Sequence, residues 1–456
     1  MVNVDLSGRT RLDACPGALQ VHAAADGGLA RVRVPGGRLT AAQLRELARA
    51  AAGHGTGVIE LTSRANVQVR GLRTGTGTGG VPEDGERLPE PDARIPSGFA
   101  ARMARAGLLP SPTHERVRNI LASPLTGCDG AGTVDVGPLV SELDRLLCAR
   151  PALAALSGRF LFALDDGRGD VAGLGADAGI LPVGADGTGL VVAGADSGLR
   201  VPLDAAVPAL LAVAEAFLAE LAELADSADR EVTAWRIKEL PDGPARVTAR
   251  VRAALSARVR EPVRLRPAVA GPLGVLPGRD GRVALGVGAP LGRLTSAQAE
   301  LLADLAGSAS PDGARSGGEV RLTPWRGVVL PGLAGHEAGA AITRLADAGL
   351  VTGPGSPWAG VSACTGRPGC AKSLADVQAD AALAVAATAG SGSGHGGGTL
   401  PVHWAGCERR CGRPRGRVVE AVATGDGYRV ELGGQSLACA DIEQTAAAVA
   451  AARGEK

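Results

Sequence analysis

The sequence predicts an internally duplicated α+β protein, in which two small β-α-β-β units and two larger α/β domains are related by a pseudo-two-fold axis. Three observations predict this fold class. A long segment occurs twice, each copy passes from strand-like to helix-like periodicity and back, and each copy precedes a longer stretch of mixed pattern. A repeat this wide indicates two copies of a domain pair, because solenoid repeats have periods of about 20 to 50 residues.

The repeat is visible in two pairs of segments. P-G-G-R-L-T-A-A-Q-L-R-E-L at 35–47 parallels P-L-G-R-L-T-S-A-Q-A-E-L-L at 290–302, and I-E-L-T-S-R-A-N-V-Q-V-R-G-L at 59–72 parallels V-R-L-T-P-W-R-G-V-V-L-P-G-L at 320–333. Equivalent positions are 255 residues apart at Gly37 and Gly292 and 261 apart at Leu61 and Leu322. We therefore expect two similar halves with a ligand site between them, as is common at domain interfaces.

The first copy has the pattern of one strand, one helix and two strands. The alternation at Leu29 to Val34 predicts a strand, and Thr40 is a suitable N-cap for a helix over Ala41 to Ala52. Two strands are expected at Val58 to Leu61 and Asn66 to Val69. This β-α-β-β order over residues 15–74 is typical of a ferredoxin-like half domain, and the second copy is expected over residues 262–350.

The remaining chain is expected to form a linker and two larger domains. The glycine-, proline- and acid-rich segment 75–91 predicts a flexible linker. Residues 92–238 mix helix and strand patterns and are expected to form a tetrapyrrole-binding α/β domain, an assignment that depends on the resemblance described below. Residues 351–456 are expected to form a second α/β domain that carries the cysteine motifs, with helices near 373–389 and 440–453 and a hairpin between 418 and 432.

The balance of charges argues against several classes of partner. With 48 basic and 47 acidic residues the net charge is +1, so a general nucleic-acid surface is not expected. The N-terminal residues show no apolar signal region, and the most apolar stretch, Val201 to Ala225, contains acidic residues and predicts an amphipathic helix. We expect a cytoplasmic protein that binds neither nucleic acid nor membrane.

Four of the eight cysteines form two close pairs in glycine- and proline-rich loops. Cys364 and Cys370 are spaced C-x5-C, Cys407 and Cys411 are spaced C-x3-C, and 36 residues separate the pairs. Two disulfides, a zinc site or unrelated buried thiols would each explain four cysteines. A reducing compartment disfavours disulfides, and the wide C-x5-C spacing disfavours zinc. The pattern favours thiolate ligands of a [4Fe-4S] cluster.

The arrangement C-x5-C followed by G-C-x3-C-G resembles the cluster site of the sulfite and nitrite reductase family. The wording A-C-T-G-R-P-G-C-A, and His403 before G-C-E-R-R-C, is most similar to the precorrin-3B synthase branch of that family. The resemblance implies an oxygen-dependent monooxygenase of cobalamin biosynthesis with a [4Fe-4S] cluster, a tetrapyrrole substrate and a mononuclear non-haem iron whose ligands the sequence does not locate. An NADH-linked reductase or a ferredoxin would supply its electrons.

Two other functions stay open at the level of sequence. A sirohaem-dependent sulfite or nitrite reductase would use Cys411 to bridge the cluster and the sirohaem iron, as the resemblance implies. A non-catalytic iron–sulfur or tetrapyrrole-binding protein would keep the same motifs without turnover. No catalytic residue is assigned from the sequence.

Three stretches resemble the tetrapyrrole-binding segments of the family. Arg64, Asn66 and Gln68 alternate, so in a strand they share one face, and arginine forks suit the carboxylates of a tetrapyrrole rim. The resemblance points to further substrate-binding residues: Arg118, Asn119 and Arg159. The reductases place two basic residues around the phenylalanine at this last position, whereas this chain has Arg159 before Phe160 and Leu161 after it. This difference disfavours the reductase hypothesis.

The cysteine loops also contain cations that would raise the potential of a negatively charged cluster, or serve as ordinary surface charges. They are Arg367, Lys372, Arg409 and Arg410.

Overall fold

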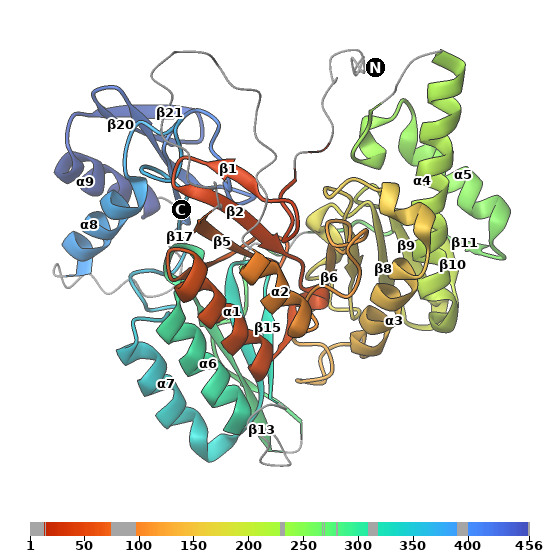
Figure 1. Cartoon of the computed structure of the whole chain (residues 1–456), viewed down its shortest axis with the longest axis horizontal. Helices are drawn as coiled ribbons and strands as arrows, with labels where there is room; N and C mark the ends of the chain where they lie inside the picture. The colour runs from red at the N-terminus through yellow and green to blue at the C-terminus, as the bar shows by residue number, and fades with distance from the viewer. Residues whose placement is uncertain are drawn as a thin grey trace.

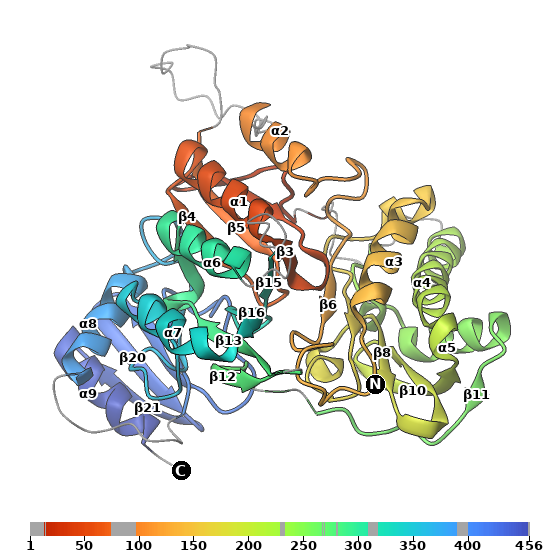
Figure 2. The same ribbon diagram turned by 90° about the horizontal axis from the view of Figure 1, so that it is seen from below.

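The computed structural model has three lobes, with the duplicated half domains between two larger domains (Figure 1). Figure 2 shows the same order from below, with α1 and α6 side by side in the middle. The structure describes residues 13, 15–73, 97–228, 233–266, 268, 270–279, 281–308, 318–389 and 400–454. The predicted linker at 75–91 lies outside the described residues, as do residues 390–399.

The two half domains exchange a strand. The first sheet has the order β1-β2-β5-β4-β14 and the second the order β12-β13-β16-β15-β3. β3, which follows β2 of the first copy in the chain, pairs with β15 of the second copy, and β14 of the second copy pairs with β4 of the first. Their strands are β1 His22–Ala24, β2 Gly27–Val32, β3 Arg38–Thr40, β4 Val58–Leu61, β5 Val67–Leu72, β12 Gly274–Pro277, β13 Arg282–Gly288, β14 Arg293–Thr295, β15 Glu319–Leu322 and β16 Gly327–Ala334.

The helices of the half domains cover the two sheets from one side. α1 (Ala41–His54) packs against α6 (Ser296–Ser308), while α2 (Ser97–Arg105) and α7 (Ala338–Asp347) flank this pair. One apolar core runs through both half domains, because the exchanged strands and the α1–α6 contact leave no boundary between them. The predicted start of α1 is confirmed, since Thr40 caps the backbone of Gln43 and the Gln43 side chain caps Thr40 in return.

The larger domain after the first copy has a six-stranded sheet of order β11-β10-β9-β8-β7-β6. β6 (Ile120–Ala122), β7 (Phe162–Leu164) and β8 (Ala178–Pro182) are parallel, and β9 (Thr188–Val192), β10 (Ala195–Val201) and β11 (Arg258–Val259) continue antiparallel. Its helices are α3 Gly137–Cys148, α4 Ala206–Ala228 and α5 Gly243–Ala254.

The helix α4 is apolar enough to be tested as a membrane span. By length and composition the stretch Leu203–Asp226 would qualify, but 56% of its apolar window is buried inside the protein. It packs against α3, α5, β8 and β9. These contacts are those of a core helix.

The larger domain after the second copy has a five-stranded sheet of order β17-β18-β19-β20-β21. Its strands β17 (Val361–Ala363), β18 (Val402–Ala405) and β19 (Val419–Thr424) are parallel, and β20 (Gly427–Leu432) and β21 (Gln435–Cys439) complete an antiparallel edge. α8 (Val377–Ala389) and α9 (Ile442–Arg453) pack together on it. Parallel strands followed by an antiparallel edge therefore occur in both larger domains, as the predicted duplication requires.

Candidate functional site

The four paired cysteines lie in loops that leave neighbouring strands at the same edge of the sheet. Cys364 and Cys370 follow β17, while Cys407 and Cys411 follow β18, and these two strands are parallel. The carboxyl ends of parallel strands meet at one edge, so two loops far apart in the sequence are brought together. Cys411 is exposed and the other three are partly buried.

The thiols are close enough to influence one another. Burial raises the pKa of Cys364, and negative charge on Cys411 and Cys407 raises it further, while backbone N–H groups that donate to its sulfur oppose the shift. One of these donors is Gly406 N, at 3.2 Å from Cys364 Sγ. Three thiols that influence one another, with Cys370 in the same loop as Cys364 and N–H donors aimed at the Cys364 sulfur, fit the ligand set of a [4Fe-4S] cluster. A bound cluster would supply one-electron transfer at this edge.

A buried histidine contacts the backbone of the second cysteine loop. His403 lies in β18, is fully buried and places Nδ1 at 3.0 Å from Ser362 Oγ. Burial lowers its pKa to about 3, helped by the charges of Arg326 and Arg413, whereas its contact with the Cys411 backbone opposes this. The imidazole therefore stays uncharged beneath Cys411.

The predicted cations of the cysteine loops have different surroundings. Arg367 Nε donates to Ser373 O at 2.9 Å and so fixes the first loop. Arg410 is held by Glu408, Glu420 and Glu431. Lys372 and Arg409 are exposed. The charge of Arg410 is thus balanced by carboxylates, and a role for these cations in raising the cluster potential stays a prediction.

The predicted strand face of Arg64, Asn66 and Gln68 is wrong at two positions: only Gln68 lies in β5, whereas Arg64 and Asn66 lie in the turn before it, where Ala65 has a φ of 51°. Arg31 is the register partner of Gln68, and its Nε donates to Gln68 Oε1 at 2.9 Å. Gln68 Nε2 in turn donates to Glu60 at 3.2 Å. Arg33 lies one residue beyond the end of β2 and is buried.

Asn66 and Asn119 join the first half domain to the neighbouring larger domain. Asn66 Oδ1 accepts from Val34 N at 2.8 Å, and its Nδ2 donates to Asn119 Oδ1 at 3.0 Å. Asn119 Nδ2 donates to Gly158 O at 2.6 Å. Both amides are buried and engaged within the protein. Direct substrate contact by either stays a prediction.

Arg118 forms a bidentate ion pair in this structure. Its Nε and Nη2 lie 2.6 and 2.7 Å from the two oxygens of Asp144, and Nη1 donates to Leu108 O at 3.1 Å. It also lines a cavity of about 450 Å³ at the boundary between the half domain and α3. Its predicted contact with a substrate carboxylate is untested, and it would require the Asp144 pair to open.

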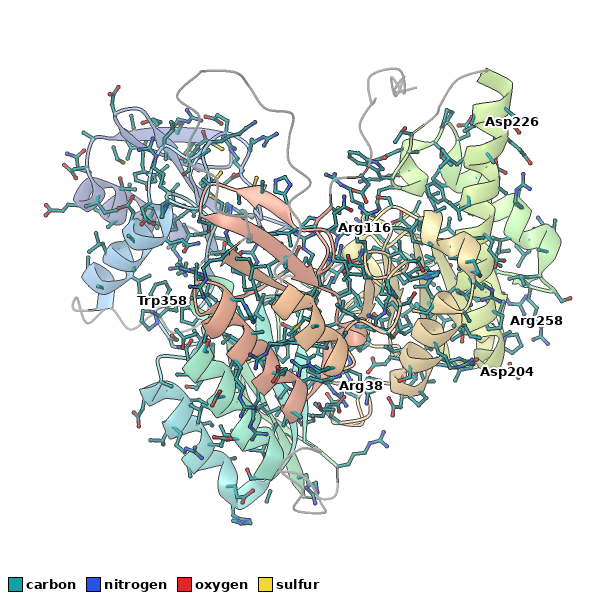
Figure 3. The ribbon with its side chains drawn as sticks, in the orientation of Figure 1. Arg38, Arg116, Asp204, Asp226, Arg258 and Trp358 are labelled. Carbon is teal, nitrogen blue, oxygen red and sulfur yellow. The ribbon has the colours of Figure 1, made fainter. Side chains whose placement is uncertain are left out.

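Four guanidinium groups near this strand face have no carboxylate partner among the described residues. We refer to them as the arginine group: Arg31, Arg33, Arg64 and Arg159. Arg33 is only 1% exposed, its Nε donates to Arg116 O at 3.1 Å, and its Nη1 and Nη2 find no acceptor in the described chain. Figure 3 shows Arg116 where the half domain meets the larger domain.

Burial and mutual repulsion lower the pKa values within this group. Burial lowers the pKa of Arg33 to about 9, and the charges of Arg31 and Arg64 add to the effect. Burial also lowers the pKa of Arg64 to about 10, with further contributions from Arg236 and Arg31. The Arg31 pKa is lowered by burial and by Arg159. Uncompensated buried cations are costly unless an anion binds them.

Sequence reasoning missed Arg31 and Arg33. The signal was present in the alternation A-R-V-R-V at 30–34, inside a stretch that is predicted as a strand. Alternating arginines also suit a solvated strand face, and only the bond from Arg31 to Gln68 and the burial of Arg33 show that neither is an ordinary surface charge.

The same strand also reaches the cysteine loops. Arg70, two residues beyond Gln68 on β5, pairs with Asp26 and donates from Nη2 to Gly369 O at 2.5 Å. Gly369 directly precedes Cys370. From the second copy, Arg326 donates to Gly412 O at 3.0 Å, beside Cys411. The half domains therefore connect the arginine group with both cysteine loops.

The equivalent face of the second copy is filled by the protein itself. By the repeat offsets, glycines occupy the positions of Arg31 and Arg33, at Gly286 and Gly288. A Cβ at Gly286 would lie 2.4 Å from Pro272 O, so no side chain fits there. The candidate site thus belongs to the first copy alone, in agreement with its unshared R-A-N-V-Q motif.

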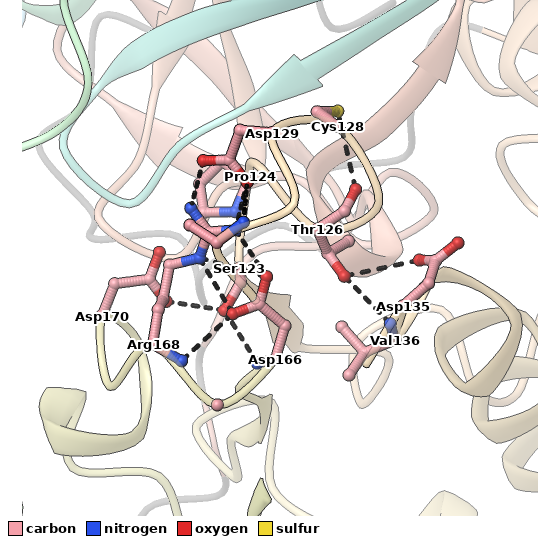
Figure 4. Close-up of polar contacts among 12 residues, drawn as sticks. Ser123, Pro124, Thr126, Cys128, Asp129, Asp135, Val136, Asp166, Arg168 and Asp170 are labelled. Atoms are coloured by element: carbon pink, nitrogen blue, oxygen red, sulfur yellow. Dashed lines mark hydrogen bonds and ion pairs between the residues drawn. The ribbon is translucent and has the colours of Figure 1, made fainter. Parts of the chain in front are cut away.

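Three carboxylates near Ser123 lie close enough together to form a candidate second metal site. Ligand oxygens of Asp165, Asp166 and Asp170 lie within 4.8 Å of one another. Figure 4 shows that Ser123 donates to Asp170 and that Arg168 joins Asp166 to Asp129. Four backbone N–H groups donate to Asp165. Among the described residues Asp165 and Asp166 are thus engaged by several donors, and Asp170 by Ser123 alone, so this group offers no free pair of carboxylates for a mononuclear iron.

Comparison with known proteins adds an independent line of evidence. Residues 22–76 and 276–348 match the family described as the nitrite/sulfite reductase ferredoxin-like half domain. The chain is 27% identical over 437 residues to a precorrin-3B synthase of Sinorhizobium sp, which covers 93% of this chain and 83% of the relative. It is 28% identical over 449 residues to the ferredoxin–nitrite reductase of Synechococcus elongatus, which covers 91% of this chain and 79% of that protein.

A solved structure has a similar fold. The Mycobacterium tuberculosis NirA protein matches with a TM-score of 0.67 and 22% sequence identity, over 90% of this chain and 77% of that one. The two matched half domains coincide with the two exchanged sheets described above, so the predicted fold class is confirmed.

Proposed function

We propose that this chain, which carries two ferredoxin-like half domains of the nitrite/sulfite reductase type, is an oxidoreductase of that family and a precorrin-3B synthase. The proposed enzyme is a monooxygenase of cobalamin biosynthesis that hydroxylates a meso carbon of precorrin-3A and closes a lactone with a side-chain acetate. One oxygen atom of O2 enters the product, and the other leaves as water with two electrons and two protons from a donor.

The observation that carries the proposal is the arginine group. Arg31, Arg33, Arg64 and Arg159 have no carboxylate partner among the described residues, although two of them have pKa values strongly lowered by burial. A tetrapyrrole intermediate carries up to eight carboxylates on its rim, and planar guanidinium forks bind carboxylates bidentately. Bound substrate would therefore provide the charge that these arginines lack.

In this proposal the arginine group orients the macrocycle, and Gln68 keeps Arg31 in place. Cys364, Cys370, Cys407 and Cys411 would hold a [4Fe-4S] cluster, which supplies electrons one at a time when bound. The contact between Arg70 and Gly369 favours a short separation between substrate and cluster. The protein's own contribution is positioning and charge compensation.

The alternative is a sirohaem-dependent sulfite or nitrite reductase, which the similarity to a ferredoxin–nitrite reductase suggests. Position 161 argues against this alternative. The resemblance to the reductases implies a second basic residue there, but this chain has Leu161, which is 4% exposed and packed in the apolar core. A small oxyanion would have one fewer cation here. We further propose a cytoplasmic location and electron supply from an NADH-linked reductase or a ferredoxin.

The test is oxygen uptake by protein purified without air, supplied with precorrin-3A and a reductant. We expect oxygen consumption that depends on precorrin-3A and a product heavier by one oxygen atom. Reduction of sulfite or nitrite by protein with bound sirohaem would favour the reductase. Tight binding of precorrin-3A with no turnover under any reductant would favour a non-catalytic binding protein.

A further inference from the structure

Residues 233–242, just before α5, bring an aromatic ring to the arginine group. The ring of Trp235 lies under the guanidinium of Arg159, with Arg159 Cζ 4.2 Å from the ring centroid. Arg159 is exposed, and no carboxylate pairs with it in the described chain. A cation held over a tryptophan face loses much of its rotamer freedom before any ligand arrives.

A buried aspartate ties this segment to the turn before β7 that carries Arg159. Asp177 forms an ion pair with Arg236 and accepts from Ile237 N at 3.1 Å. It also accepts from Leu161 N at 3.0 Å. Burial raises the Asp177 pKa, whereas Arg236 and these N–H donors act against that rise. These bonds join Arg236 and Ile237, which follow Trp235 in the chain, to the backbone two residues beyond Arg159.

The backbone before Arg159 is fixed from the opposite side. Gly158 N donates to Asp13 Oδ2 at 2.6 Å. Gly158 O accepts from Arg64 Nη1 at 3.3 Å and from Asn119 Nδ2 at 2.6 Å. Since Gly158 and Phe160 are buried while Arg159 is exposed, the structure presents one side chain from a rigid turn.

Arg236 supplies a cation near the position where Leu161 lacks one. After burial, the charge of Arg236 is the largest cause that lowers the pKa of Arg64. Arg236 Nη2 also donates to Gly175 O at 2.5 Å, so its guanidinium is fixed on two sides. The cation is thus provided by a distant segment and already carries a counter-charge.

We infer that Trp235, held by the ion pair of its neighbour Arg236 with Asp177, is a positioning residue of the arginine group, which sets Arg159 for a planar substrate with several carboxylates. This inference rests on the proposed function and deepens it. Trp235 covers one face of the Arg159 guanidinium and leaves its N–H edge available, which suits a bidentate carboxylate. A compact oxyanion would instead need converging point charges, and Leu161 removes one of them.

The test uses uroporphyrin, which has eight carboxylates, as a binding probe for the protein with its cluster intact. We expect Trp235→Leu to weaken uroporphyrin binding about tenfold, as loss of a partly desolvated cation–π contact implies. Trp235→Phe keeps an aromatic face and should restore most of the affinity. Lys238→Ala, an exposed residue in the same segment, serves as the matched control and should bind as the wild type does.

Iron and acid-labile sulfide content should be equal in all four proteins. Equal affinity of Trp235→Leu and wild type, or equal weakness of the Phe and Leu variants, would overturn the inference. If Trp235→Leu does not fold, the inference is tested instead by the quenching of tryptophan fluorescence when uroporphyrin binds to the wild type and to Trp235→Phe. We expect uroporphyrin to quench more emission in the wild type than in Trp235→Phe, and equal quenching would overturn the inference. Absence of uroporphyrin binding by the wild type would instead count against the proposed function.

Discussion

Arg33→Met should stabilise the protein without substrate and weaken its binding of tetrapyrroles. Arg33 is 1% exposed, and two of its nitrogens have no acceptor among the described residues. Its pKa, lowered to about 9, means that the folded protein disfavours the cation, and the cost persists at pH 7.5, where Arg33 is still charged. Stability should therefore rise with pH above about 9, as the unfolded state then binds more protons.

The size of the effect follows from the same shift. A lowering of the pKa from 12.5 to about 9 corresponds to an upper limit of ~5 kcal/mol. Methionine keeps most of the packing volume, and replacing buried charges by apolar residues has stabilised proteins by about 1–4 kcal/mol. We expect a gain of about 1–3 kcal/mol, since the bond from Nε to Arg116 O is lost.

The assay is thermal and denaturant unfolding of the cluster-loaded protein, together with uroporphyrin titration. Arg200→Met is the matched control, because Arg200 is equally buried but pairs with Asp196. Removing the Arg200 guanidinium leaves the buried Asp196 carboxylate unpaired and should lower the free energy of unfolding by about 3–5 kcal/mol. A destabilised Arg33→Met with unchanged uroporphyrin affinity would refute the reasoning, because Arg33 would then be a structural residue.

Three further predictions concern the neighbouring domains. Burial, with the charges of Asp165 and Asp166, raises the pKa of Asp170 to about 7. The free energy of unfolding of the wild type should therefore fall as the pH rises from about 4 to about 7. Asp170→Asn should avoid this loss and exceed the wild type by about 1–2 kcal/mol at pH 8; parallel pH profiles of the unfolding midpoint would contradict this. Gly406→Ala should lose most cluster iron, because its Cβ would lie 1.9 Å from Ser373 Oγ. Cys407→Ser should abolish the cluster absorbance, and unchanged iron and sulfide content would rule out this ligand.

The glycine prediction has an internal control. Gly425 lies in the turn between β19 and β20, and a Cβ there would meet nothing within 4 Å. Gly425→Ala should therefore keep its full iron content. Equal iron loss in both variants would mean that the cysteine loops tolerate no change anywhere in this domain, and the close contact at Gly406 would not be the cause.

Local patterns were sufficient for much of the fold. The alternation at Val58 to Leu61 and the capping signal at Thr40 predict β4 and the start of α1 at the positions observed. The exchange of β3 and β14 between the half domains was not predictable in this way. A three-residue strand carries no local information about its partner, which is set by the packing of α1 against α6.

The candidate site was predictable only in part. The cysteine spacing and the Arg64–Gln68 alternation are local signals. The structure brings the cysteine loops to one edge of a sheet, but it places Arg64 and Asn66 in the turn before β5 and only Gln68 in the strand. Trp235 could not be connected with Arg159 from the sequence, because Asp177 makes that link through space. The ion pair between Arg118 and Asp144 is equally non-local, and the sequence near position 118 does not predict it.

The most direct test of the central claim is an absorption spectrum of anaerobically purified protein, with iron and acid-labile sulfide analysis. The account predicts a broad iron–sulfur shoulder, matching iron and sulfide, no bands of a bound tetrapyrrole, and oxygen uptake when precorrin-3A is added. Sharp chlorin-type bands from tightly bound sirohaem, with sulfite or nitrite reduction and no response to precorrin-3A, would contradict it.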